Sequence, residues 1–171
     1  MTEKQKYALD KTIAALPDDS REAFRNVAEY AISLGYMPVI KGNETYTDFI
    51  KSKTKRTILK IDLNLNPPRL GMKFYAIPEY FGIFKEALEE RIRYYSKLNY
   101  EIKSHCTGCM QRKNGRCHEP QGYTFALSDG NQGFICGFGI IPLPTFTIEN
   151  VPEIKEALRL QDIFFMKQIS E

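Results

Sequence analysis

The amino-acid sequence predicts an α+β domain, with a mainly antiparallel sheet, helices packed on one face of the sheet, and a cysteine-rich metal-binding loop. The expected element order is two helices, four strands, a helix, the cysteine loop, two strands and a last helix. Short turns join the expected strands, which favours antiparallel neighbours. Three of the four cysteines and both histidines fall within residues 104–119, which predicts a metal site there.

The size and charge of the chain bound the class of protein. Its 171 residues fit a single domain, residues 1–171, with a cysteine-rich loop at residues 99–121 inserted before the last hairpin. The 24 basic and 21 acidic residues give a net charge of +3, and this balance argues against nucleic acid as the partner. The amino-terminal residues lack the apolar core of a secretion signal, and no apolar run is long enough to span a membrane. We therefore expect a cytoplasmic protein.

Two helices are expected at the amino-terminal end. The first covers Thr2 to Leu16 and ends before Pro17. The second begins with a capping-box pattern, in which Asp19 caps the helix and Glu22 stands three residues later. Gly35 is placed to end this helix, because helices often end with a left-handed residue.

Four strands are expected next. Residues 36–41 and 45–51 flank a turn at residues 42–44. Residues 56–65 give the clearest strand, because apolar side chains alternate with polar ones and point one way: Leu59, Ile61, Leu63 and Leu65. Two prolines must then turn the chain, since neither can donate to a β-ladder. The fourth strand follows, with alternating apolar residues at Leu70, Met72, Phe74 and Ala76.

The second half of the chain contains a long helix, the cysteine loop, a hairpin and a last helix. The long helix is expected over residues 79–98. The hairpin joins residues 122–127 to residues 133–141. The last helix begins with a second capping box, Asn150 with Glu153, and runs to about residue 167.

The cysteine spacing predicts a structural zinc site with Cys106, Cys109, Cys117 and Cys136 as ligands. The first two form a C-x2-C pair, which lets two thiolates from one turn reach the same ion. The dipeptide Asn114-Gly115 is the strongest short hairpin signal and would return Cys117 towards that pair. The loop is too polar to build a core of its own, which indicates that something holds it. Nearby basic side chains would offset the charge of four thiolates: Lys103, Arg112, Lys113 and Arg116.

Several alternatives stay open at this site. His105 or His118 can replace Cys136 as a ligand, and Cys136 can equally be a small core residue, because it alternates with phenylalanines. Reduced cysteines without metal, an iron–sulfur cluster, or a redox dithiol at Cys106 and Cys109 would fit the same residues. A catalytic zinc would need an open position and a base, for which Glu119 is the candidate inside the loop.

Two further groups of residues are candidate binding surfaces. The segment from Lys51 to Arg56, with Lys60, Arg69 and Lys73, can form a phosphate-binding patch or simply a solvated rim. Tyrosines cluster around the long helix, where they are core residues or the wall of a pocket for a small apolar or planar ligand: Tyr75, Tyr80, Tyr94, Tyr95 and Tyr100. The glycines near residue 137 do not match a phosphate-binding fingerprint.

Several strings along the chain suggest a family. GYMPVIKG, SKTKRTILKI, RLGMKFYA, the cysteine loop, GYTFAL, FICGFG and VPEIKEALRLQD resemble a group of small proteins of Gram-positive bacteria that has no assigned activity. More weakly, residues 57–88 resemble the YjbR/YdhG type of small α+β domain. Neither resemblance transfers a catalytic residue.

The function expected from the sequence is that of a binding or interaction module with a structural zinc site. Its partner would be a small molecule or a protein. The alternatives are a metal- or thiol-dependent enzyme and a weak nucleic-acid binder. The coordination shell separates the first two, because four protein ligands indicate a structural zinc, whereas three ligands plus water allow catalysis.

Overall fold

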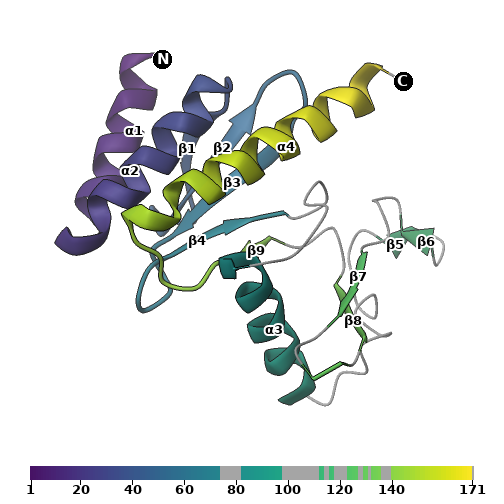
Figure 1. The fold of residues 1–171 in the computed structure, drawn as a ribbon. Coiled ribbons are helices and arrows are strands. Elements are labelled where there is room, and N and C mark those ends of the chain that lie inside the picture. Colours follow the sequence, from purple (N-terminus) through teal and green to yellow (C-terminus); the bar gives the residue numbers. More distant parts are fainter. Residues whose placement is uncertain are drawn as a thin grey trace.

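The computed structural model describes residues 1–73, 82–97, 112–113, 116–117, 123–126, 129–130, 132–135 and 140–170. In this part of the chain, four helices pack against a five-stranded antiparallel sheet, which confirms the predicted α+β class (Figure 1). None of the described helices is long and apolar enough to cross a membrane.

Helices α1 (Glu3–Ala14) and α2 (Asp18–Ser33) lie close to the predicted ranges. A capping box starts α1, because the Thr2 hydroxyl accepts from the backbone N–H of Gln5 while the Gln5 side chain accepts from the backbone N–H of Thr2. The predicted role of Gly35 is confirmed. Gly35 has φ +90°, and the N–H groups of Gly35 and Tyr36 bond back to the carbonyls of Ile32 and Ala31. This is a Schellman ending, which satisfies the last carbonyls of α2.

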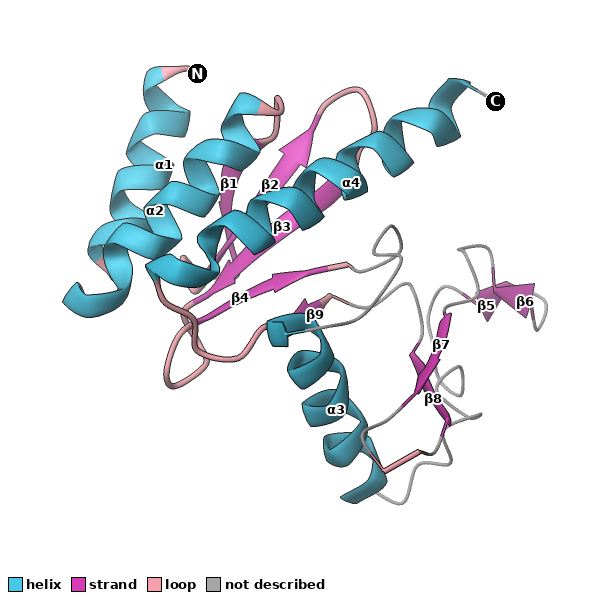
Figure 2. Ribbon diagram, in the orientation of Figure 1, coloured by secondary structure: helices cyan, strands magenta, loops and turns pink. Residues whose placement is uncertain are grey.

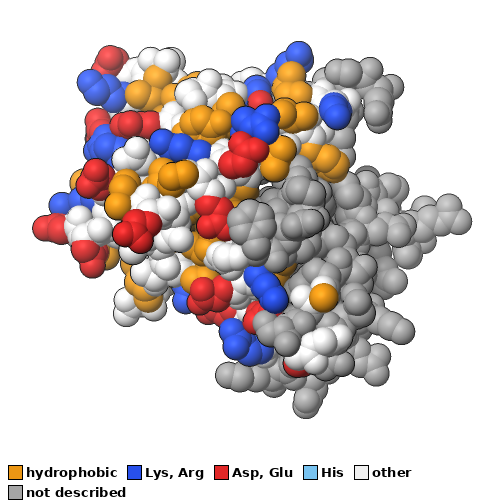
Figure 3. All heavy atoms as spheres, viewed as in Figure 1, with side chains coloured by type: hydrophobic (Ala, Val, Ile, Leu, Met, Phe, Trp, Pro, Cys, Tyr) orange, Lys and Arg blue, Asp and Glu red, His pale blue; other side chains and the backbone are white. Residues whose placement is uncertain are grey.

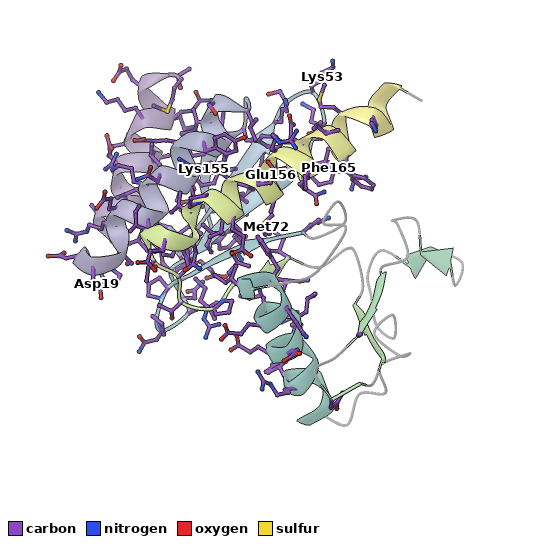
Figure 4. All side chains as sticks on the ribbon, viewed as in Figure 1. Asp19, Lys53, Met72, Lys155, Glu156 and Phe165 are labelled. Atoms are coloured by element: carbon purple, nitrogen blue, oxygen red, sulfur yellow. The ribbon has the colours of Figure 1, made fainter. Side chains whose placement is uncertain are left out.

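Two predicted helix caps are wrong in position. Helix α2 begins at Asp18, directly after Pro17, and has no side-chain cap. Asp19 therefore lies inside the first turn of α2 (Figure 4). An acidic residue in a first turn is favourable for the helix dipole even when it does not cap. Asn150 ends a short 3-10 helix, η2 (Ile148–Asn150), which is capped by Thr147. The last helix, α4 (Val151–Ser170), continues directly from it.

The five strands of the sheet lie in the order β1-β2-β3-β4-β9, and each neighbouring pair is antiparallel. Their bounds are Met37–Lys41 for β1, Tyr46–Lys51 for β2, Arg56–Asp62 for β3, Arg69–Met72 for β4 and Ile141–Pro142 for β9. The register aligns one row of fully buried apolar side chains on β2, β3 and β4: Phe49, Leu59 and Met72. The first hairpin is confirmed, and the alternation predicted for β3 is confirmed at Leu59 and Ile61.

The predicted end of β3 is wrong. The strand stops at Asp62, whose carboxylate accepts from the backbone N–H of Asn64 at 3.1 Å. This local turn bends the chain away from the sheet. Leu65 was expected to face the core with Leu59 and Ile61, but its side chain is 38% exposed. The expected continuation of β4 through Phe74 and Ala76 lies outside the described residues.

The predicted strand over residues 133–141 divides between two sheets. Its first part is β8 (Gln132–Ile135), which forms a separate hairpin with β7 (Tyr123–Ala126) as expected. Its last part, β9, joins β4 as the edge of the main sheet. Gly71 on β4 permits this approach, because a Cβ atom there would lie 2.6 Å from Cγ2 of Ile140.

The helices divide between one face and one edge of the sheet (Figure 2). Helices α1, α2 and α4 pass over β1, β2 and β3, and their apolar residues share one core with the strands. Helix α3 (Gly82–Lys97) packs against β9 and also against β8. Its Phe84 and Leu88 are buried in the same core.

Asp162 ties α4 to the end of the sheet where β1 begins and β2 ends. Its Oδ1 accepts from the Tyr36 hydroxyl at 2.9 Å and from Nζ of Lys51 at 2.7 Å. The side chains of Lys51 and Asp162 are only 18% and 16% exposed. Burial, together with the hydrogen bond to Asp162, raises the pKa of the Tyr36 hydroxyl far above its ordinary value. Tyr36 therefore stays protonated as a donor, which indicates a structural role for this cluster.

Replacing Asp162 with Ala should lower the free energy of unfolding by about 3 kcal/mol, or roughly 10 °C in Tm, because it leaves Lys51 and Tyr36 with an unmatched charge and an unmatched donor. The matched control is Glu156→Ala, on the same helix, where an exposed carboxylate pairs with Arg159 (Figure 4). The control should keep Tm close to the wild-type value. Equal thermal shifts in the two variants would contradict this account.

Candidate functional site

A pocket of about 340 Å³ lies where α3, β9 and the turn between β3 and β4 meet. Its size falls at the lower end of the range for small-molecule sites. Three stretches distant in the sequence line it, with these side chains: Leu65, Asn66, Arg69, Ala87, Glu90, Arg91, Tyr94 and Pro142. The pocket therefore exists only when the sheet and α3 have come together.

Arg69 is the fixed cation of this pocket. It is the first residue of β4 and lies opposite Asp62 in the register. Its Nη1 donates to Oε2 of Glu90 at 2.7 Å and to the carbonyl of Leu143 at 3.4 Å. The Arg69 side chain is 23% exposed, so one side of the guanidinium is held by protein while the group still reaches the pocket. Such anchoring lowers the entropy that a ligand must remove on binding.

The other wall of the pocket is mainly apolar. Ala87 is buried, whereas Leu65 and Tyr94 are 38% and 55% exposed. Pro142 closes the side formed by β9. The guanidinium carbon of Arg91 lies 5.9 Å from the centre of the Tyr94 ring, at the outer limit of a cation–π contact. The pocket thus combines an aromatic and aliphatic surface with charged groups.

A second hollow, of about 620 Å³, lies between α1 and the β1–β2 hairpin. Two of its three described charged residues, Lys41 and Glu44, are engaged with other side chains of the protein. Glu44 accepts from Lys11 at 2.6 Å, and Lys41 donates to Asp48 at 2.9 Å. These contacts link elements of the fold, so the pocket beside α3 is the stronger candidate for a ligand site.

The structure describes little of the predicted metal site. Cys117 belongs to β6 (Arg116–Cys117), which pairs with β5 (Arg112–Lys113). The hairpin predicted around Asn114-Gly115 is therefore confirmed in the backbone. The other predicted or alternative site residues lie outside the described residues: Cys106, Cys109, Cys136, His105, His118 and Glu119. Over the part of the chain that was searched, no three His, Cys, Asp or Glu residues gather in a way that would hold a metal.

The predicted basic patch is largely engaged with acidic groups or buried. Lys51 bonds to Asp162, Arg69 bonds to Glu90, and Lys73 is only 8% exposed. Lys60 pairs with Asp62 at 2.9 Å and lies over the ring of Tyr46. On the face shown in Figure 3, basic and acidic side chains are interspersed. This distribution favours the solvated-rim interpretation over a phosphate-binding surface.

Sequence reasoning named Arg69 only as part of that patch and Tyr94 only as one of several tyrosines. It did not bring the two residues together. Leu65 and Glu90 had no functional assignment. The one signal available was the density of tyrosines along the long helix, which the pocket-wall interpretation used.

Comparison of the chain with protein-family models, with curated proteins and with solved structures finds no match in any of the three. The resemblance to small proteins of Gram-positive bacteria stays a prediction.

Double-stranded DNA or RNA should bind weakly, with a Kd above roughly 0.1 mM at 0.15 M salt, since most of the clustered cations already have an acidic partner or are buried. Fluorescence anisotropy with a labelled duplex measures this directly. Micromolar binding that weakens steeply with added salt would restore the nucleic-acid hypothesis. Replacing the exposed turn residues Lys53 and Lys55 with Gln would then show whether that turn is responsible.

Proposed function

We propose that this protein is a binding module for a small molecule, which occupies the pocket beside α3, and that the cysteine segment is a structural zinc site. The observation that carries the binding role is the position of Arg69. Its guanidinium is held through Nη1 by Glu90 and by the carbonyl of Leu143, and Arg69 is one of the residues that line an apolar-walled pocket. A few oriented polar groups in an apolar hollow are typical of small-molecule sites.

A binding role fits the chemistry of the described lining better than an enzymatic one. The side chains around the pocket are guanidinium, carboxylate, phenol, amide and apolar groups. Thiols and imidazoles, on which the rival metal- or thiol-dependent enzyme would depend, are not among these lining residues. The cytoplasm is the expected compartment for such a module.

The zinc proposal keeps Cys106, Cys109, Cys117 and Cys136 as ligands, with His105 and His118 as alternates. Two backbone features support it. The tight β5–β6 hairpin returns the chain at Cys117. In the β7–β8 hairpin, Tyr123 pairs with Ile135, so the first residue of β7 and the last residue of β8 lie side by side. Cys117 precedes this end of the hairpin in the sequence, and Cys136 directly follows it.

A structural zinc would also stabilise the helix that forms one wall of the pocket. Helix α3 packs against both β8 and β9. The segment between α3 and β7 contains few apolar residues, so a metal would supply the stability that a core cannot. Holding the two small hairpins would then hold the outer side of α3, the helix that contributes Glu90, Arg91 and Tyr94.

Small aromatic compounds should bind the pocket and perturb the backbone amides of Leu65 and Ala87. A panel of benzoate, benzamide and benzamidinium, titrated into the 15N-labelled full chain, tests this by NMR. At least one member should bind with Kd on the order of 1 mM. Tyr94→Ala should weaken that binding roughly tenfold, because stacking on the ring is lost. Absence of binding by all three compounds would overturn the proposed binding function.

Zinc content should fall from about one ion per chain to below about 0.2 in Cys106→Ser and in Cys109→Ser, since each variant loses a thiolate ligand. Elemental analysis of protein purified without chelator measures it. Ser104→Ala, in the same segment, is the matched control and should keep its metal. Full metal content in both cysteine variants would rule out the proposed ligand set. An unchanged wild-type value near zero, with four titratable thiols, would favour free cysteines.

A further inference from the structure

We propose that the ligand is a small monoanion with an apolar body, and that its carboxylate binds the side of Arg69 formed by Nε and Nη2. This inference rests on the proposed function, because it names the class of molecule that the pocket takes. Three features of the pocket support it: the division of the donors of Arg69, the charge of the described lining, and the apolar character of the opposite wall.

Toward the residues that the structure describes, Arg69 donates from one of its three nitrogens. Both of its hydrogen bonds, to Glu90 and to the Leu143 carbonyl, leave from Nη1. No described residue accepts a hydrogen bond from Nε or Nη2. These two nitrogens form the side of the guanidinium that can hold both oxygens of a carboxylate at once. Because Nη1 fixes the group, the pair of donors is already oriented.

The same protein contains an example of this contact. Arg159 on α4 donates from Nε and from Nη2 to the two carboxylate oxygens of Glu156, each at 2.7 Å. Figure 4 labels Glu156 on this helix. In that pair both donors are engaged. At Arg69 the equivalent donors belong to a side chain that lines a pocket.

The charge of the pocket selects a single negative charge. Among the described lining residues, Arg69 and Arg91 carry two positive charges and Glu90 carries one negative charge, a formal sum of +1. A monoanion brings this sum to zero. A dianion would leave one excess negative charge near Glu90, and a cation would add to the positive charge.

The remaining wall indicates the body of the ligand. Leu65, Ala87 and Pro142 provide aliphatic surface, and Tyr94 provides a half-exposed ring. This wall would pack favourably against a flat apolar group that is joined directly to the carboxylate. An acid without such a body, for example acetate, would use only part of the pocket.

The test compares benzoate with its neutral isostere benzamide, with benzamidinium and with inorganic phosphate, all titrated into the full chain. Benzoate should bind at least about tenfold tighter than each of the other three, as expected for a charge-assisted bidentate contact. It should also shift the Nε–H resonance of Arg69, which benzamide should leave in place. This resonance reports on the proposed contact itself and not on the stability of the fold.

Three variants refine the test. Arg69→Lys keeps the charge but removes the paired donors, so benzoate binding should fall about tenfold. Glu90→Gln removes the neighbouring negative charge while Arg69 keeps its bond to Leu143, so benzoate binding should rise by roughly two- to fivefold. Arg159→Lys is the matched control away from the pocket and should leave benzoate binding unchanged.

The outcomes separate this inference from the proposed function. If benzoate and benzamide bind the pocket equally, or if phosphate binds tighter than benzoate, the carboxylate assignment is wrong while the binding module stands. If no compound binds, the proposed function itself fails. Should Arg69→Lys not fold, the opposite effects expected for Tyr94→Ala and Glu90→Gln decide the question, and weaker benzoate binding in Glu90→Gln would overturn the assignment.

Discussion

The contact of Asp162 with Tyr36 and Lys51 is the constraint on which the rest of the fold depends. The donors precede the acceptor by 126 and 111 residues, so the contact closes the chain around its core. It fixes α4 over the face of the sheet that α1 and α2 begin to cover. Helices α1, α2 and α4 cover that face, and α3 packs against β9 at the edge of the sheet. The pocket stands at this edge, and its geometry therefore follows from the way in which the chain is closed.

Much of the fold could be predicted because its signals are local. Gly35 ends α2 through its own backbone conformation, and the short turn at residues 42–44 pairs β1 with β2. The alternation around Leu59 placed β3 correctly, and Asn114-Gly115 gave the β5–β6 hairpin. Each of these features depends on a few consecutive residues. At such positions the local conformational preference of the residues agrees with the local structure that the folded chain adopts.

The incorrect predictions concern competition between neighbouring signals. Asp19 and Asn150 are both good capping residues, but Pro17 and Thr147 stand at the actual starts. Leu65 continues an apolar alternation, yet the turn formed by Asp62 ends the strand first. A local pattern shows that a residue type suits a position. It does not show which of two adjacent positions the tertiary packing will select.

The candidate site could not be predicted in the same way, because it depends on distant pairs. Arg69 meets Glu90 only after α3 has packed against the sheet, and it meets Leu143 only after β9 has joined β4. Counting basic residues placed Arg69 in a patch with Lys51 and Lys60. Their partners decide otherwise, since each of these cations has an acidic neighbour. The sequence shows how many basic residues are present, whereas the structure shows which of them are paired with acidic side chains.

Arg69 and Glu90 show how one ion pair can serve both the fold and a ligand. A lysine at this position would direct its single ammonium group to Glu90 and retain no oriented donor pair. The guanidinium can satisfy Glu90 through Nη1 and present Nε and Nη2 elsewhere. Glu90 orients the group but also weakens its attraction for an anion. Selective recognition must then come from the geometry of the donor pair and from the apolar wall. Such a site discriminates by shape as much as by charge, which fits a pocket built where three elements meet.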